Sequence, residues 1–248
     1  MSSHIQHVAS HFKGRVYSWD VVNEGMVDVP KVHTCKNWTC SLKKTASSGE
    51  GVDWTKAGDS QTSYVEKAFR YAHAADPEAK LFYNEYAIHT ENNKMLYVEM
   101  MLRDLLAKGV PIHGIGMQTH IQNSVENKKW NATAFENVLQ RFAKLGLEIH
   151  ITELNVPVND PMYNGQTDVQ KEQTLASLYS SVLKLCLQNP ACKSFETWGF
   201  TDMRNSYSQK GLPAPGVFYY DNLYQAKVAR QAVAQVLANQ WNSESKVY

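Results

Sequence analysis

The stretch YSWDVVNEGM, residues 17–26, contains a strand pattern that stops abruptly on polar residues. Its first part is rich in β-branched and aromatic side chains, which favour a strand with little contact to water. The run ends on Asn23 and Glu24, and a glycine follows. The stretch therefore predicts a buried strand that carries an amide and a carboxylate at its carboxyl end.

Strand and helix patterns alternate along most of the remaining sequence. Such alternation is typical of right-handed βαβ units that build a parallel sheet, and this gives the fold class α/β. No linker or shift in composition divides residues 1–248, so we expect one domain. A long loop is expected over 25–58. The predicted strands are 15–23, 80–86, 112–118, 147–154 and 193–200, and the predicted helices are 4–12, 59–75, 91–108, 132–145, 167–188 and 225–239.

Polar or aromatic side chains stand at the carboxyl end of every predicted strand. In a (β/α)8 barrel these ends meet on one face, where active sites are built. Glu24 and Glu153 come from different strands, so they are candidates for the two carboxylates of glycoside hydrolysis. Neutral amides and aromatic rings nearby suit the hydroxyl groups and apolar faces of a sugar. The candidate sugar-binding residues are Asn23, Asn84, Tyr86, Gln118, His120, Trp198 and Tyr207.

The charge balance argues against several classes of partner. The 248 residues carry a formal net charge of +1, so no basic field would hold nucleic acid or an anionic membrane. No apolar run approaches the roughly 20 residues of a membrane span. A Gly-rich phosphate cradle and an Arg cluster are not seen, and the histidines lack metal-ligand spacing. We therefore expect a neutral sugar as ligand, with no nucleic acid, no membrane, no cofactor and no catalytic metal.

Cysteines and glycosylation patterns bear on the compartment. The close cysteine pairs are Cys35 with Cys40 and Cys186 with Cys192. Their spacing favours disulfides in an oxidising compartment, with free thiols or a metal site as alternatives. Asn37 and Asn131 each begin a tripeptide that fits N-glycosylation. These features indicate secretion, whereas the first residues lack the pattern of a signal peptide.

Five ordered motifs give the sequence a specific resemblance. They are WDVVNE, LFYNEY, GIGMQTH, HITELNV and TWGFTD, one from the end of each predicted strand. In this order they resemble the strand ends of glycoside hydrolase family 10, the endo-β-1,4-xylanases, over essentially the whole chain. The resemblance implies a TIM-type (β/α)8 barrel and a retaining hydrolysis of xylan or xylo-oligosaccharides.

The resemblance implies roles for the residues around the reacting bond. Glu24 matches the family's acid/base catalyst, and Glu153 matches its nucleophile. Asn23 matches an amide that contacts the sugar beside the reacting carbon. His120 matches the histidine that hydrogen-bonds the nucleophile, and Gln118 matches a glutamine near the acid/base.

Further positions match residues along the substrate path. Asn84 and Tyr86 match residues on the leaving-group side, and Trp198 matches a tryptophan packed over the cleavage site. The pair Cys186–Cys192 looks like a disulfide found in many fungal members of the family.

Three positions depart from the family pattern. Glu85 stands where Asp is usual, Asn155 also replaces a usual Asp, and Tyr207 replaces a second Trp. The tyrosine suggests weaker stacking on the glycone side. None of the three substitutions removes a catalytic carboxylate.

The resemblance also implies an incomplete barrel. The strand that ends in Glu24 matches the fourth strand of the family, so this sequence would supply strands four to eight of a secreted xylanase. The signal peptide would belong to the missing N-terminal part. Open first and last strands would expose unpaired backbone groups, so we expect marginal stability or self-association through these edges.

Three functions remain open. The first is a retaining endo-β-1,4-xylanase, and the second is an inactive or carbohydrate-binding remnant of one. The third is another barrel hydrolase, such as an endoglucanase or a metal-dependent amidohydrolase, although the paired strand-borne histidines of the latter are not seen. If the strands keep barrel geometry, the carboxyl groups of Glu24 and Glu153 should lie about 5–5.5 Å apart, as a retaining mechanism requires.

Overall fold

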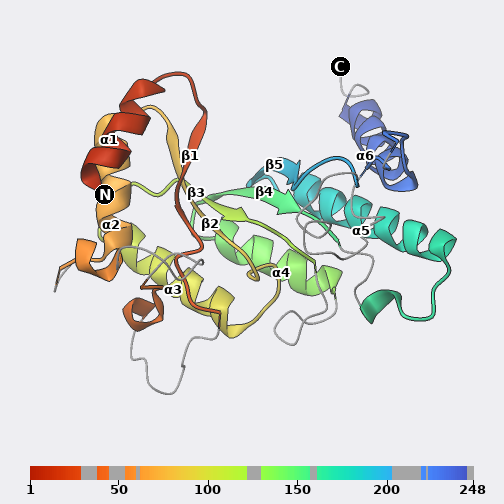
Figure 1. Cartoon of the computed structure of the whole chain (residues 1–248), viewed down its shortest axis with the longest axis horizontal. Coiled ribbons are helices and arrows are strands. Elements are labelled where there is room, and N and C mark those ends of the chain that lie inside the picture. The colour runs from red at the N-terminus through yellow and green to blue at the C-terminus, as the bar shows by residue number, and fades with distance from the viewer. Residues whose placement is uncertain are drawn as a thin grey trace.

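The computed structural model describes residues 1–28, 38–44, 54–59, 62–121, 130–156, 161–202, 219–221 and 223–244. Helices and strands alternate along them, and every predicted strand and helix is present with small shifts at its ends (Figure 1). The elements are α1 Ser2–His11, β1 Ser18–Asn23, α2 Tyr64–Ala75, β2 Lys80–Glu85, α3 Asn93–Ala107, β3 Gly114–Met117, α4 Ala132–Ala143, β4 Glu148–Leu154, α5 Asp168–Gln188, β5 Cys192–Thr197 and α6 Val228–Glu244.

Short 3₁₀ turns and caps complete these elements. Within the predicted loop 25–58, the described residues include two 3₁₀ turns, Trp38–Ser41 and Trp54–Ala57. Helix α2 begins later than predicted because the side chain of Ser63 accepts a hydrogen bond from the Glu66 amide at 3.2 Å and caps it.

The strands form one parallel sheet in the order β1-β2-β3-β4-β5. Neighbours in the sheet are also neighbours in the sequence, as expected for successive βα units, and the predicted parallel sheet is confirmed. The helices follow the sheet from α1 and α2 near one end to α5 and α6 near the other (Figure 1). Because all strands run the same way, their carboxyl ends lie along one face.

The core lies around the three inner strands. All residues of β3, and nearly all of β2, are buried, whereas β1 and β5 are only partly buried. The prediction that the first strand is buried is therefore wrong, because β1 pairs with β2 alone among the described residues. Glycines in β3 make room for large side chains of β2. A Cβ at Gly114 would lie under 3.0 Å from the Phe82 ring, and one at Gly116 would lie under 3.0 Å from the Asn84 side chain. Asn84 can therefore sit inside the sheet only because its partner in the register, Gly116, has no side chain.

The outer strands β1 and β5 each pair with one neighbour within the described residues. Large aromatic residues near them are exposed, among them Tyr17, Trp198 and Phe200. Among the described helices, none has the length and apolar character that a membrane span requires.

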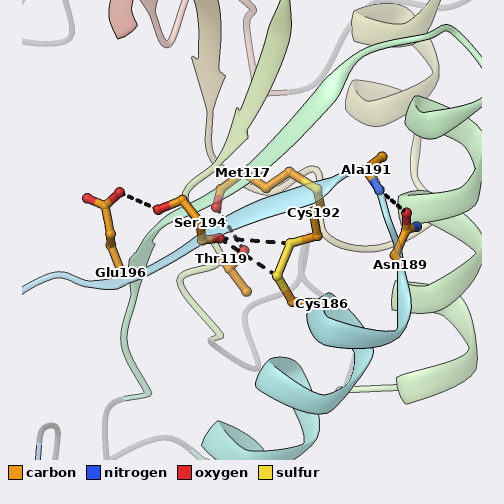
Figure 2. Close-up of a disulfide and its surroundings, with 8 residues drawn as sticks. All are labelled: Met117, Thr119, Cys186, Asn189, Ala191, Cys192, Ser194 and Glu196. Carbon is orange, nitrogen blue, oxygen red and sulfur yellow. Dashed lines mark hydrogen bonds between the residues drawn. A yellow bond between two sulfur atoms is a disulfide. The ribbon is translucent and has the colours of Figure 1, made fainter. Parts of the chain in front are cut away.

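A disulfide joins Cys186 and Cys192, linking the end of α5 to the start of β5 (Figure 2). This predicted pair is confirmed. Cys40 is also disulfide-bonded, while Cys35 and the glycosylation candidate Asn37 lie outside the described residues. Asn131 caps α4 by accepting a hydrogen bond from the Ala134 amide at 3.0 Å, and its glycosylation stays a prediction.

Candidate active site

The backbone turns sharply where three successive strands end. Glu24, Ala87 and Thr119 follow β1, β2 and β3, and they have φ angles of 56°, 57° and 58°. This left-handed region is costly for residues other than glycine. The turn after β1 is tied to the next strand, because the Glu24 amide donates to the Asn84 carbonyl oxygen at 2.9 Å.

Asn84 is the centre of the polar side chains at these strand ends. Its Nδ2 donates to Asn23 Oδ1 at 3.0 Å and to Glu153 Oε1 at 2.9 Å. Its Oδ1 accepts from the Thr152 hydroxyl at 2.8 Å. Asn84 is buried, so these contacts hold one amide between the two strands that carry Asn23 and Glu153.

Gln118 extends this arrangement to the second carboxylate. Its Nε2 donates to Asn23 Oδ1 at 3.0 Å and to Glu24 Oε1 at 3.1 Å. Hydrogen bonds therefore run without a break from Glu24 through Gln118, Asn23 and Asn84 to Glu153. These five residues are called the strand-end network below.

His120 contacts the other oxygen of Glu153. Its Nε2 lies 3.2 Å from Glu153 Oε2, and its Nδ1 lies 2.9 Å from Asn155 Oδ1. The tautomer of a histidine is set by the partner of its other nitrogen, so Asn155 helps to decide how the ring meets Glu153. Nearby His89 is kept neutral, since burial and the charge of His120 lower its pKa to about 4.

The sequence matches a known family over nearly its full length. The model described as Glycosyl hydrolase family 10 covers residues 1–236. The chain belongs to glycosyl hydrolase family 10. It is 37% identical over 202 residues to endo-1,4-beta-xylanase B of Thermotoga neapolitana. The aligned region covers 82% of this chain and 51% of that protein. It is 32% identical over 239 residues to endo-1,4-beta-xylanase A of Phanerodontia chrysosporium. Here the aligned region covers 94% of this chain and 50% of that protein.

Solved structures of family 10 proteins have the same fold. Native xylanase 10B from Thermotoga maritima matches with a TM-score of 0.79 at 34% identity, over 98% of this chain and 66% of that one. Xylanase 10B from Thermotoga petrophila, solved in complex with xylobiose, matches with a TM-score of 0.78 at 34% identity, over 96% and 65%. The predicted TIM-barrel fold class is confirmed. The chain spans about half the length of the two curated relatives and about two thirds of these structures.

A second polar group lies beside the family 10 motifs and was not predicted from them. Lys43 returns next to the first strand end, where its amide donates to the Gly25 carbonyl oxygen at 2.8 Å. Its Nζ lies 3.7 Å from Glu24 Oε2 and donates to the Tyr86 hydroxyl at 3.4 Å. The sequence gives no signal that Lys43 lies beside Glu24, because this contact depends on how a long predicted loop brings the chain back to the end of β1.

The ring of Tyr86 packs against Lys94, which forms a buried ion pair with Glu85. Lys94 Nζ lies 3.2 Å from the centre of the Tyr86 ring and 2.9 Å from Glu85 Oε1, and the side chains of Lys94 and Glu85 are only 2% and 0% exposed. Burial raises the pKa of Glu85, and Lys94 opposes this shift. The Met26 amide and Tyr83 hydroxyl also donate to Glu85. Glu85, which stands where the family usually has Asp, therefore makes several polar contacts and holds the lysine that packs on Tyr86.

The remaining aromatic candidates are placed differently. Trp198 directly follows β5, where its amide donates to the Leu154 carbonyl oxygen at 3.2 Å, and the residue is 52% exposed. It lies at the correct end of its strand, but no described contact joins it to the strand-end network. Tyr207 lies outside the described residues.

Asp20 on β1 is a titratable group that the sequence analysis missed. Solvent still reaches Asp20, but the surrounding protein atoms remove part of the hydration of its carboxyl group. This desolvation, together with the negative charges of Glu153 and Glu196, raises its pKa to about 6. It interrupts an apolar strand, and that interruption was the available signal. Among the described residues, no cluster of histidine, cysteine or acidic side chains could hold a metal ion.

Proposed function

We propose that this chain provides the catalytic pair of a retaining endo-β-1,4-xylanase. The observation that carries the proposal is the strand-end network, which links two carboxylates from β1 and β4 through neutral amides. A retaining glycosidase needs two carboxyl groups on opposite sides of the scissile bond and fixed at short range. Neutral amides can fix them without adding a competing charge.

In this proposal the two carboxylates divide the work. Glu153 attacks the anomeric carbon and forms a glycosyl-enzyme ester, while Glu24 donates its proton to the leaving oxygen. Glu24 then removes a proton from water, which attacks the same carbon and frees Glu153. Asn84 and His120 each contact one oxygen of Glu153, so they orient the nucleophile throughout.

The substrate would lie across the strand ends. Asn23 and Asn84 offer amides to sugar hydroxyls, and Tyr86 offers a ring on the leaving-group side, supported by Lys43 and Lys94. Structures of family members have been solved with xylobiose and with xylotriose, which favours xylan or a xylo-oligosaccharide. The disulfide at Cys186 favours a secreted protein.

A carbohydrate-binding role without catalysis is the second candidate. It is favoured by the single pairing of β1 and β5 within the described residues, because an open sheet edge lowers the rigidity that catalysis needs. The same edges would allow copies of this chain to associate.

Xylan hydrolysis by the purified chain tests the proposal. We expect release of reducing sugar that is lost in Glu153→Ala and retained in Glu136→Ala, an exposed carboxylate on α4. Proton NMR of the first product from xylotetraose should show the β anomer, because two displacements at one carbon retain configuration. A folded chain without hydrolysis would support the binding role, and an α anomer would contradict the retaining mechanism.

A further inference from the structure

A groove lies along α5, beside the segment that leads into α4. Its volume is about 520 Å³, within the range of pockets that bind small ligands. Trp130 directly precedes the N-cap of α4, and Gln166 directly precedes the N-cap of α5. Each helix starts on the side where the preceding strand ends, so the groove begins on the same side of the fold as the strand-end network.

The groove is lined by side chains that are uncharged and mostly polar. The lining residues on α5 form one stripe, because they recur along the helix at intervals of three or four residues and so share one face. From Gln170 to Ser181 this stripe extends along about 16 Å of helix axis. The lining residues described are Trp130, Gln166, Gln170, Gln173, Thr174, Ser177, Leu178 and Ser181.

Several of these side chains are fixed before any ligand arrives. Thr174 Oγ1 donates to Gln166 Oε1 at 3.0 Å. Gln170 Oε1 accepts from the Thr167 amide at 2.8 Å in a capping box. The indole of Trp130 packs on Phe135, with ring centres 5.1 Å apart. Fixed side chains lower the entropy cost of binding.

Among the described residues, two charged pairs lie close to the groove. Lys171 lies 3.3 Å from Asp168 within the first turns of α5. Glu172 lies 3.0 Å from Lys227, which comes from the segment before α6. A second depression, between the later parts of α4 and α5, has charged residues in its lining, Glu136 and Lys144. The uncharged lining is therefore specific to the groove at Trp130.

We propose that this groove is a second binding site for a neutral β-1,4-linked xylan chain, separate from the catalytic strand ends. The inference rests on the proposed function for the identity of the polymer. An indole together with amides and hydroxyls matches the apolar faces and hydroxyl groups of sugar rings. A nucleic acid or acidic peptide would require cations in the lining, and an apolar helix would require a hydrophobic stripe.

The test follows the indole N–H signals of the full chain by NMR while xylohexaose is added. Glu153→Ala is present throughout so that the sugar stays intact, and Trp130→Phe assigns the Trp130 signal. We expect the Trp130 signal to shift with saturation. The double variant Gln173→Ala, Ser177→Ala should weaken this binding about tenfold, the loss expected for two or three hydrogen bonds. Gln231→Ala, an exposed glutamine on α6, is the matched control.

Each outcome separates this inference from the proposed function. A Trp130 signal that stays unmoved overturns the groove site, whether or not the Trp198 signal shifts. A Trp130 shift that survives unchanged in the double variant also overturns it. Hydrolysis by the chain with Glu153 intact is measured independently, so its absence would overturn the proposed function alone. An acidic hexagalacturonate should leave the Trp130 signal in place.

Discussion

Gly116→Ala tests whether the position of Asn84 depends on the absence of a side chain in β3. The added Cβ would lie 3.0 Å from Asn84 Cγ and still closer to Oδ1. Oδ1 is the end of a side chain, which could normally turn away at little cost. Here the amide makes three hydrogen bonds, to Thr152, Asn23 and the Glu153 carboxylate, so turning away breaks them together.

The magnitude follows from those three hydrogen bonds. Two neutral bonds contribute about 1 kcal/mol each and the bond to the carboxylate about 2 kcal/mol. Replacing glycine by alanine contributes up to about 1 kcal/mol in the opposite direction by restricting the unfolded chain. We therefore expect Gly116→Ala to lower the free energy of unfolding by about 3 kcal/mol.

Urea unfolding in two backgrounds isolates the cause. In the Asn84→Ala background the two nearest atoms, Oδ1 and Cγ, are gone, and the Cβ at position 84 remains at 3.2 Å from the added methyl, a contact that a small shift relieves. Gly116→Ala should then be neutral or raise the free energy of unfolding by up to about 1 kcal/mol, which gives a coupling of about 3–4 kcal/mol between the two positions. An equal loss in both backgrounds would refute the argument, because the clash would then lie with the backbone and not with Asn84.

Three further predictions concern ion pairs, protonation and the disulfide. Lys94→Met leaves the buried Glu85 carboxylate without its cation, so Tm should fall by about 6–12 °C, corresponding to about 3 kcal/mol; a fall no larger than that of the exposed Lys108→Met would contradict this. The raised pKa of Asp20 means that ionisation destabilises the fold as pH rises from about 4 to above 6. Asp20→Asn should therefore raise Tm relative to the parent at pH 8 but not at pH 4. The gain in free energy of unfolding is at most about 1 kcal/mol because solvent reaches the side chain; an equal gain at both pH values would refute the assignment. Cys186→Ser opens a loop with a sequence separation of 6 and should cost about 2 kcal/mol in urea unfolding, whereas an unchanged midpoint would show that the disulfide adds no stability.

The sequence predicted the elements well because their signals are local. Short apolar runs and helical periodicity depend on neighbouring residues alone, so β2 was predicted as 80–86 and observed as Lys80–Glu85. The grouping of the strand-end residues could also be predicted from the sequence, since parallel strands must bring their carboxyl ends to one face. The sequence order of Asn23, Asn84 and Glu153 was therefore enough to predict that they meet.

The features that the sequence did not predict depend on strand register or on contacts between segments far apart in the chain. That Gly116 faces Asn84 follows from the pairing of β2 with β3, and a shift of one residue would have removed it. Lys43 reaches Glu24 only after the intervening loop folds back. The groove at Trp130 depends on how the segment before α4 lies against α5, and no single stretch of sequence contains that information. Such features arise from distances between elements, and periodicity carries no information about these distances.

The position of Glu24 on an outer strand raises the question of what holds it in place. Within the described residues β1 pairs with β2 alone, yet the contacts of Glu24 come from the side that is present. Its amide is bonded to Asn84 on β2, its carboxylate accepts from Gln118 beyond β3, and Lys43 lies beside its other oxygen. The geometry of the carboxylate pair thus depends on β1 to β4 and their loops. Loss of rigidity at the open edge should therefore affect sugar binding more than the alignment of Glu24 with Glu153, and would appear as a raised KM with a smaller change in kcat.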